Sequence, residues 1–338
     1  MIGRPLTKKP DAKRVSNASL RTFDLSRFLH IFCKNYPDGQ IIEGLGVQKL
    51  VRKAVIPAAG LGTRLLSATK EQPKEMLPLF ASDEGVLCLK PTVQQVFEQL
   101  FDFGLREFCF IVGKGKRALE DHFTPDRDYV QQLISRGKAD KASQLRRFYD
   151  QIAASSISWV NQPEPQGFGH AVLQAEPFVG RDTFLVHAGD TYITSKPTPI
   201  HSRLLDAHFR TAADATLAVE ELSDPREYGI AEVRGTDLNA LQVVRVEEKP
   251  KQPMSKFAIM PLYVFAGSIF DSLKRTKKDT RGEIQLTDAI QDLLNAGRRV
   301  QAVCLRADDV RLDIGTPETY WKALELSHRN AKPGSVTL

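Results

Sequence analysis

One stretch after residue 50 constrains the fold of this chain more than any other. Residues 54–56 (AVI) form a short apolar run typical of a buried strand, and residues 57–64 (PAAGLGTR) follow it. Glycines let a backbone approach a ligand closely, and successive N–H groups in such a turn make a concavity for anions. Three cations, Arg64, Lys70 and Lys74, come next. This order of strand, glycine turn and cations predicts a phosphate-binding site.

The rest of the chain alternates apolar strand patterns with amphipathic helix patterns. Such alternation predicts an α/β fold: a Rossmann-like, mixed and mostly parallel sheet flanked by helices. Residues 228–265 contain alternating apolar and polar runs typical of strands, which predict a small β insertion, either a hairpin or a small mixed sheet, beside that sheet. Residues 81–91 are predicted to form a loop. The other expected strands are 107–112, 156–160, 183–187, 216–220 and 300–305. The expected helices are 93–103, 117–122, 129–153, 171–175, 199–210, 268–275, 286–295 and 317–329.

Charge separates the first 49 residues from the remainder. They hold nine Lys/Arg and four Asp/Glu, a net +5 of the chain's total of +6. We expect residues 1–49 to be a basic, weakly ordered extension or a mis-assigned start, with one short helix near residues 25–32. Residues 50–338 form the predicted catalytic domain. A basic arm can bind nucleic acid, but these charges are scattered, so a nucleic-acid partner is not favoured.

Cysteine and apolar patterns indicate the compartment. The four cysteines lie far apart and form no CxxC pair, which suits a reducing cytoplasm better than a disulfide framework or a zinc site. No apolar run approaches the roughly 20 residues that cross a bilayer. We therefore expect a cytoplasmic protein without a membrane partner.

Two common phosphate-binding motifs do not fit the glycine turn. The dinucleotide motif GxGxxG would need a third glycine where this chain has Leu65, and the pattern GxxxxGK[ST] is absent. What remains is GLGTR, followed by residues 68–78 (ATKEQPKEMLP). Together these segments resemble the signature of bacterial- and archaeal-type UTP–glucose-1-phosphate uridylyltransferases, which belong to the sugar nucleotidyltransferase family.

Further motifs that resemble those of this family follow in the same order along the chain. They are Gln162 with residues 167–171 (GFGHA), Asp190, residues 248–250 (EKP), residues 282–288 (GEIQLTD) and residues 313–316 (DIGT). The resemblance covers about residues 51–325. It implies that UTP and glucose 1-phosphate are the substrates, and that UDP-glucose and pyrophosphate are the products.

The resemblance also implies roles for individual residues. Arg64 and Lys74 would neutralise the leaving phosphates, and Lys249 the attacking sugar phosphate. The sugar would contact Gly189, Gly229 and Glu248. The nucleotide would bind to Ala59, Gly60, Leu61, Gly62, Thr63, Glu75, Gln162 and Gly167. We expect His170 and His187 to be structural, because this chemistry needs no histidine base.

A divalent cation fits the same chemistry. Phosphoryl-type transfer relies on positioning and charge neutralisation, and Mg²⁺ is usually held by one or two carboxylates together with substrate phosphates. Asp190 is the first candidate ligand of Mg²⁺ and Asp313 the second.

Several alternatives stay open at this stage. A thymidylyltransferase or a broad-specificity nucleotidyltransferase differs by few contacts, because one methyl group in a pocket is worth only about 1–3 kcal/mol. A non-catalytic nucleotide-sugar sensor would share the fold. Pro261 stands where the family usually has glycine, which leaves the choice of sugar open. By analogy we expect a homo-oligomer, a dimer or a tetramer.

Overall fold

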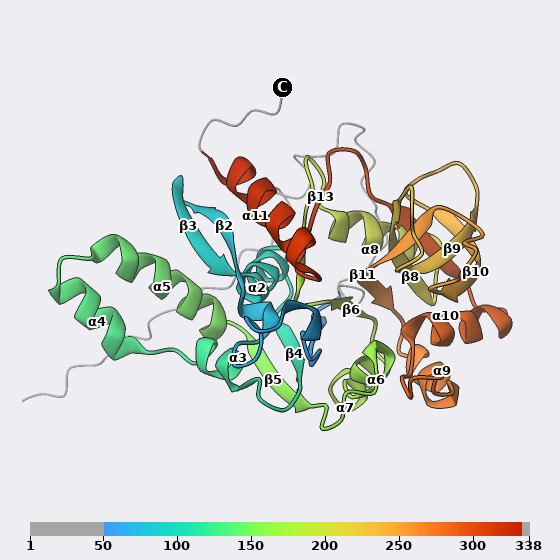
Figure 1. The fold of residues 1–338 in the computed structure, drawn as a ribbon, viewed down its shortest axis with the longest axis horizontal. Coiled ribbons are helices and arrows are strands. Elements are labelled where there is room, and N and C mark those ends of the chain that lie inside the picture. The colour runs from blue at the N-terminus through green and yellow to red at the C-terminus, as the bar shows by residue number, and fades with distance from the viewer. Residues whose placement is uncertain (1–50, 333–338) are drawn as a thin grey trace, which may run out of the picture. The chain divides into compact units, whose positions relative to one another are not determined.

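The computed structural model describes residues 51–332, and one mixed sheet forms the centre of this region (Figure 1). The strand order is β5-β4-β1-β6-β11-β8-β12-β10-β9. The pairings leave seven strands pointing one way, with β10 and β11 running against them. The strands are β1 (Lys53–Ala58), β4 (Glu107–Val112), β5 (Ser156–Asn161), β6 (Phe184–His187), β8 (Ala215–Glu221), β9 (Gly229–Arg234), β10 (Leu241–Glu248), β11 (Phe257–Phe265) and β12 (Val300–Cys304). The predicted mixed, mostly parallel sheet is confirmed.

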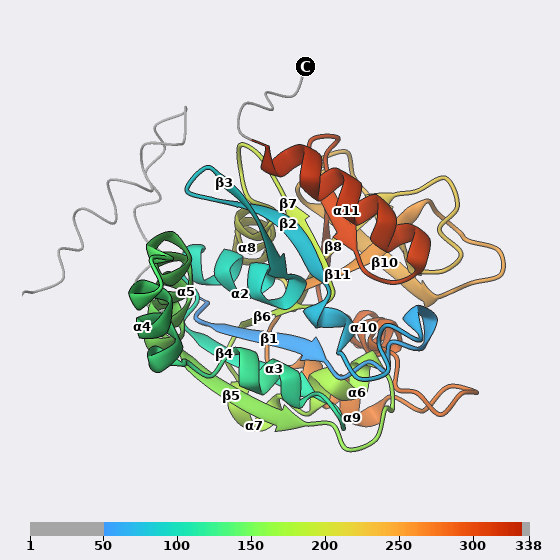
Figure 2. The same ribbon diagram turned by 60° about the vertical axis from the view of Figure 1, so that its left-hand side comes forward.

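Helices cover both faces of this sheet (Figure 2), because successive strand side chains alternate between the faces. Ala54 and Ile56 of β1 belong to one apolar cluster, whereas Val55 between them belongs to the other. The first face is covered by α2 (Thr92–Asp102), α3 (Arg117–His122), α5 (Ala139–Ala153) and α8 (Ile200–Arg210). The second is covered by α6 (Phe168–Leu173), α7 (Glu176–Val179), α9 (Ile269–Arg275) and α10 (Leu286–Asn295).

The predicted β insertion is present but is continuous with the main sheet. Strands β9 and β10 form an antiparallel pair, and β10 also pairs with β12 through Leu241 and Ala302. Strand β11 lies between β6 and β8. The predicted insertion is thus a hairpin that extends the main sheet. Leu241 and Val243, and Val246 beyond the register shift between Val243 and Arg245, bury one face of β10 in the second core cluster.

The predicted loop at residues 81–91 is a hairpin instead. Strand β2 (Pro78–Asp83) pairs antiparallel with β3 (Val86–Pro91). The turn between them is made by Glu84 and Gly85, with φ of 51° and 80°. Positive φ at both central residues suits the right-handed twist of a two-residue hairpin. The polar turn signal was visible in the sequence, whereas the pairing of the short flanking runs was not.

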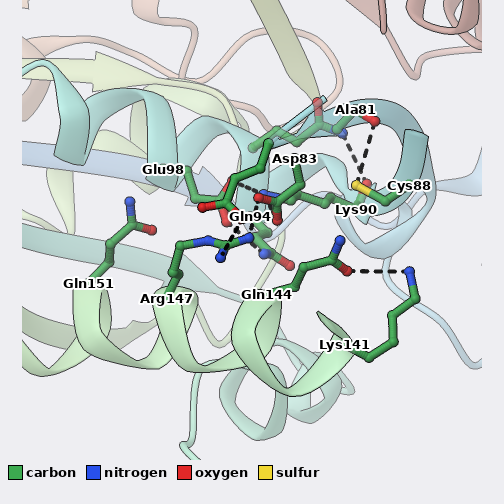
Figure 3. A network of polar contacts seen from close by, with 12 residues as sticks. Ala81, Asp83, Cys88, Lys90, Gln94, Glu98, Lys141, Gln144, Arg147 and Gln151 are labelled. Atoms are coloured by element: carbon green, nitrogen blue, oxygen red, sulfur yellow. Dashed lines mark hydrogen bonds and ion pairs between the residues drawn. The ribbon is translucent and has the colours of Figure 1, made fainter. Parts of the chain in front are cut away.

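The predicted long helix at residues 129–153 is divided in two. Helix α4 (Arg127–Ser135) ends before Gly137, whose φ of 71° stops helical geometry, and α5 follows. Arg147 of α5 pairs with Asp83 of the hairpin, while Lys90 of β3 pairs with Glu98 of α2 (Figure 3). These ion pairs join the helical segment, the hairpin and α2 around one polar cluster.

Two short strands bring a distant part of the chain to the sheet edge. Strand β7 (Thr191–Thr194) directly follows the β6 turn and pairs antiparallel with β13 (Val310–Asp313). Helix α11 (Pro317–Ala331) then begins where the predicted helix at residues 317–329 begins, with Thr316 as its cap and Pro317 in its first turn. The remaining predicted helices and strands agree with the structure to within a few residues.

Residues 1–49, including the short helix expected near residues 25–32, lie outside the described part of the chain. Within residues 51–332, no helix is both long enough and apolar enough to cross a membrane.

We predict that Phe148→Ala destabilises the domain by about 3–5 kcal/mol, the usual cost of removing a buried phenyl ring. Phe148 is 2% exposed and is the ring by which α5 contacts Phe97, Phe123 and His122, at centroid distances of 6.1, 5.3 and 5.1 Å. The midpoint of urea unfolding should fall accordingly. Ser143→Ala, at an exposed position of the same helix, should change stability by less than about 0.5 kcal/mol. Equal midpoints for the two variants would contradict this packing.

Candidate active site

The predicted site residues follow the carboxyl ends of parallel strands. The glycine turn follows β1, Gln162 follows β5, and Gly189 and Asp190 follow β6. In an open α/β sheet, ligands bind outside this edge. A fourth loop, which follows β4, lies directly against the glycine turn, because a Cβ added at Gly113 would be only 2.9 Å from the Ala59 carbonyl oxygen. The four loops therefore form one continuous region.

The glycine turn is held from behind by a threonine. Gly62 has a φ of 68°, and the Thr69 hydroxyl donates a 2.8 Å hydrogen bond to its carbonyl oxygen. A Cβ at Gly62 would stand 3.1 Å from the Thr69 Cβ. At Gly60, an added Cβ would lie 3.6 Å from the Lys74 Nζ. The turn therefore presents bare backbone beside the ammonium group of Lys74.

Lys74 and Asp190 form the ion pair at the centre of the site. Lys74 stands in a short 3₁₀ helix, Lys74–Met76, and its Nζ contacts the Asp190 carboxylate. Burial disfavours the ammonium charge, but the Asp190 and Glu75 carboxylates outweigh burial and raise the pKa of Lys74. Burial likewise opposes the Asp190 charge, yet Lys74 lowers the pKa of Asp190. Both groups are therefore charged at neutral pH, and their side chains remain 16% and 19% exposed.

Glu75 is paired with a lysine that the sequence analysis did not select. The Glu75 carboxylate accepts a 2.8 Å hydrogen bond from Lys116 Nζ, and these side chains are only 2% and 9% exposed. Burial raises the pKa of Glu75, although Lys116 and Lys74 act to lower it. Lys116 lies in the loop after β4. The sequence did carry a signal for it, because residues 113–116 (GKGK) follow a predicted strand in the same way as the glycine turn.

Asp313 lies beside Asp190 through the β7–β13 pairing. Asp313 is opposite Thr191 in the register, and the Thr191 hydroxyl is 3.3 Å from Asp190 Oδ1 and 3.5 Å from Asp313 Oδ1. Burial raises the pKa of Asp313, and the charge of Asp190 adds to this effect. Two neighbouring carboxylates provide the hard oxygen donors that suit Mg²⁺. Among residues 51–332, no group of three or more His, Cys, Asp or Glu side chains is placed to hold a metal ion.

The loop after β5 is fixed by contacts with a distant segment. Gln162 is buried, and its amide nitrogen lies 3.1 Å from the Gly167 carbonyl oxygen and 2.9 Å from His170 Nδ1. Gly167 has a φ of 94°, and an added Cβ there would stand 2.8 Å from the Ile284 carbonyl oxygen. Gly169 donates a 2.9 Å backbone hydrogen bond to the same oxygen. The blocks GFGHA and GEIQLTD, more than 100 residues apart in the chain, are thus in direct contact.

The segment GEIQLTD (residues 282–288) also contacts residues that are predicted to bind the sugar. Thr287 donates a 2.7 Å hydrogen bond to Glu248, which lies opposite Gly229 across the β9–β10 pair. A Cβ at Gly229 would lie 2.7 Å from the Thr287 hydroxyl oxygen and 3.1 Å from Glu248 Oε2. Lys249 follows with a φ of 42°, and its ammonium is 3.8 Å from the Glu248 carboxylate. The requirement for glycine at position 229 is therefore steric.

Pro261 is accommodated by an irregularity of β11. The register between β11 and β8 shifts between Ile259 and Tyr263, so a missing N–H at position 261 fits where regular pairing is interrupted. The Pro261 carbonyl oxygen accepts a 3.0 Å hydrogen bond from the Ala188 N–H. Gly189 donates to the Pro57 carbonyl oxygen at 3.1 Å. The turn before Asp190 is thereby tied to both β1 and β11.

Some predicted residues make no recorded side-chain contact with the rest of the site. Leu61, Thr63 and Arg64 are exposed, and within residues 51–332 no side-chain partner of Arg64 is recorded.

His187 is fully buried behind the Asp190 turn, where burial lowers its pKa to about 4, so it is neutral at pH 7. His170 contacts Gln162 and Gln174. Their placement is that of structural histidines.

Known proteins resemble this chain over most of its length. The nucleotidyl transferase family model matches residues 53–330. A UTP–glucose-1-phosphate uridylyltransferase of Staphylococcus epidermidis is 37% identical over 271 residues, covering 79% of this chain and 88% of that protein. A Bacillus subtilis protein of the same name is 37% identical over 280 residues, covering 82% and 89%.

Solved structures give the same result at the level of the fold. A UDP-glucose pyrophosphorylase complexed with UDP-glucose superposes with a TM-score of 0.72 at 27% identity, over 83% of this chain and all of that one. A UTP-bound enzyme from Acinetobacter baumannii has a TM-score of 0.72 at 28% identity, over 84% and 95%. The matched span contains the glycine turn, the Lys74–Asp190 pair and the Glu248 strand. The chain therefore belongs to the nucleotidyl transferase family.

Proposed function

We propose that this protein transfers the uridylyl group of UTP to glucose 1-phosphate, giving UDP-glucose and pyrophosphate. The single observation that carries the proposal is the Lys74–Asp190 ion pair beside the bare backbone of the glycine turn. A partly exposed cation and carboxylate beside an anion-binding turn suit a triphosphate. The relatives named above are uridylyltransferases of the same kind.

The proposed reaction is an in-line attack by the sugar-phosphate oxygen on the α-phosphorus of UTP. The P–O bond to the β-phosphate breaks, and pyrophosphate leaves with that electron pair. No protein nucleophile is needed, so positioning and charge neutralisation supply the catalysis. In this proposal Arg64 and Lys74 face the phosphates of UTP, and Lys249 faces the incoming sugar phosphate.

The remaining predicted residues would bind the two ends of the substrates. The backbone of the glycine turn, with Glu75, Gln162 and Gly167, would hold the uridine, and a glutamine amide can both donate to and accept from a pyrimidine edge. Gly189, Gly229 and Glu248 would contact the sugar. The contact of Glu248 with Thr287, in the segment that also holds the uridine loop, supports a shared wall for both substrates.

Mg²⁺ is the cofactor that we propose, with Asp190 and Asp313 as its protein ligands. When bound there, it would neutralise phosphate charge and orient the α-phosphate. The Thr191 hydroxyl lies close to both carboxylates and supports their orientation.

We also propose a cytoplasmic homo-oligomer. Val86, Leu87 and Leu89 of β3 are 52%, 39% and 56% exposed, and within residues 51–332 this strand pairs only with β2. An exposed apolar strand with a free edge is a surface that soluble proteins usually cover. Light scattering of the purified chain should give the mass of a dimer or a tetramer, and a monomer at micromolar concentration would contradict the proposal.

A substrate panel tests the function. We expect pyrophosphate release with UTP, glucose 1-phosphate and Mg²⁺, and kcat/KM values lower for dTTP, ATP and GTP and for other sugar 1-phosphates. Comparable rates with UTP and dTTP would favour a broad-specificity or thymidylyltransferase activity instead. Binding of UDP-glucose without any turnover would favour a sensor.

We predict that Lys74→Met and Asp190→Asn each lose at least about 100-fold in kcat, since electrostatic groups at a transferring phosphate contribute on that scale. Lys141→Met is the matched control and should leave kcat unchanged, because Lys141 is exposed on α5 and its ammonium donates a hydrogen bond to Gln144 of the same helix. Circular dichroism should show all three variants folded. A folded Lys74 or Asp190 variant within threefold of the wild-type kcat would contradict its assigned role.

A further inference from the structure

The loop after β4 supplies a lysine, Lys116, whose ammonium contacts the buried carboxylate of Glu75. Lys116 is 8% exposed, and its ammonium has one recorded partner among residues 51–332, the Glu75 carboxylate at 2.8 Å. Two residues earlier in the same loop, Lys114 is exposed. A lysine is rarely buried without a specific partner, so this loop is built to bring Lys116 to Glu75.

Glu75 occupies a position that affects the central ion pair. It is the chain neighbour of Lys74, and its side chain packs against the Asp190 turn, since a Cβ at Gly189 would lie 3.4 Å from Glu75 Cγ. Glu75 is also among the charges that act on Lys74. A buried carboxylate needs a counter-charge. Lys116 supplies this charge, and Lys74 is the other lysine that acts on Glu75.

Two lysines and two carboxylates are thus arranged as two separate pairs. Lys116 pairs with Glu75, and Lys74 pairs with Asp190. Without the Lys116 ammonium, Glu75 would be a buried charge whose nearest remaining cation is Lys74. The Lys74 side chain would then be drawn from Asp190 and the substrate phosphates towards Glu75.

We propose that Lys116 is a positioning residue for the transfer reaction: by pairing with Glu75, it keeps Lys74 directed at Asp190 and at the phosphates of the nucleotide. This inference rests on the proposed function, because it assigns to Lys74 a role in phosphate transfer. Lys116 itself acts only through Glu75 and does not touch the reacting atoms.

The test compares Lys116→Met with Lys114→Met in the full chain. We expect Lys116→Met to lower kcat by about 10- to 100-fold, the scale on which a displacement of about 1 Å affects catalysis. Lys114→Met should stay within twofold of the wild type. Rates are expressed per folded molecule, with the folded fraction taken from thermal melts, so that a simple loss of stability does not count as a loss of catalysis.

Two further variants distinguish positioning from mere structural support. Lys116→Arg keeps the positive charge and should recover part of the lost kcat. Adding Glu75→Gln to Lys116→Met removes the carboxylate that competes for Lys74, so at saturating UTP the double variant should have a higher kcat than Lys116→Met alone. Loss of the uridine contact proposed for Glu75 would instead raise the KM for UTP. A pair that only stabilises the fold would alter the melting temperature without this recovery of kcat per folded molecule.

The outcomes separate this inference from the function on which it rests. A wild type without turnover on any substrate of the panel overturns both. An active wild type with Lys116→Met within twofold of its kcat overturns the positioning role alone. A double variant whose kcat at saturating UTP is no higher than that of Lys116→Met also overturns it, because the Glu75 carboxylate would then not be what displaces Lys74.

Discussion

The Lys74–Asp190 ion pair is the interaction on which the rest of the site depends. It joins two loops that follow adjacent parallel strands, β1 and β6, across the edge where the sheet is open to ligands. A solvated ion pair contributes little to stability, but a partly buried one is strengthened by the lower local dielectric. Its cost in desolvation is tolerated because both charges stay near solvent, where a polyphosphate and a cation can reach them.

Other contacts serve to hold these two charges in place. The Pro57 and Pro261 carbonyl oxygens fix the turn that carries Asp190, and the β7–β13 pair brings Asp313 beside it. The contact between Gly169 and Ile284 sets the loop after β5 against the segment that supports Glu248. Segments from across the family match therefore converge on one edge of the sheet, although they lie far apart in the chain.

The sequence was informative where local chemistry decides the structure. The run at residues 54–64 has a strand followed by glycines, and its spacing to Lys74 is short, so the strand and the tight turn beside Lys74 could be predicted from the residues. Asp190 and Glu248 were found through the resemblance to a family rather than through any local pattern. The capped start of α11 at Thr316 was likewise readable, because a cap is a local hydrogen-bonding motif.

Pairings between distant segments were not readable in the same way. Strands β7 and β13 have four residues each, too few for a periodic signal, and their pairing depends on the tertiary fold. Lys116 was missed because a lysine in a polar loop is usually solvated, and only its contact with Glu75 shows otherwise. Residues 81–91 of the hairpin were taken for a loop because the apolar side chains of β3 are exposed and so resemble no buried strand.

We propose that this edge of the sheet transfers a uridylyl group onto a sugar phosphate. UTP labelled at the α-phosphate, incubated with glucose 1-phosphate, Mg²⁺ and the purified chain, tests this transfer. We expect the label to enter UDP-glucose, the released pyrophosphate to be unlabelled, and Asp190→Asn to remove nearly all of the product. Labelled UTP that remains intact, or a label that appears only in UMP, would contradict it.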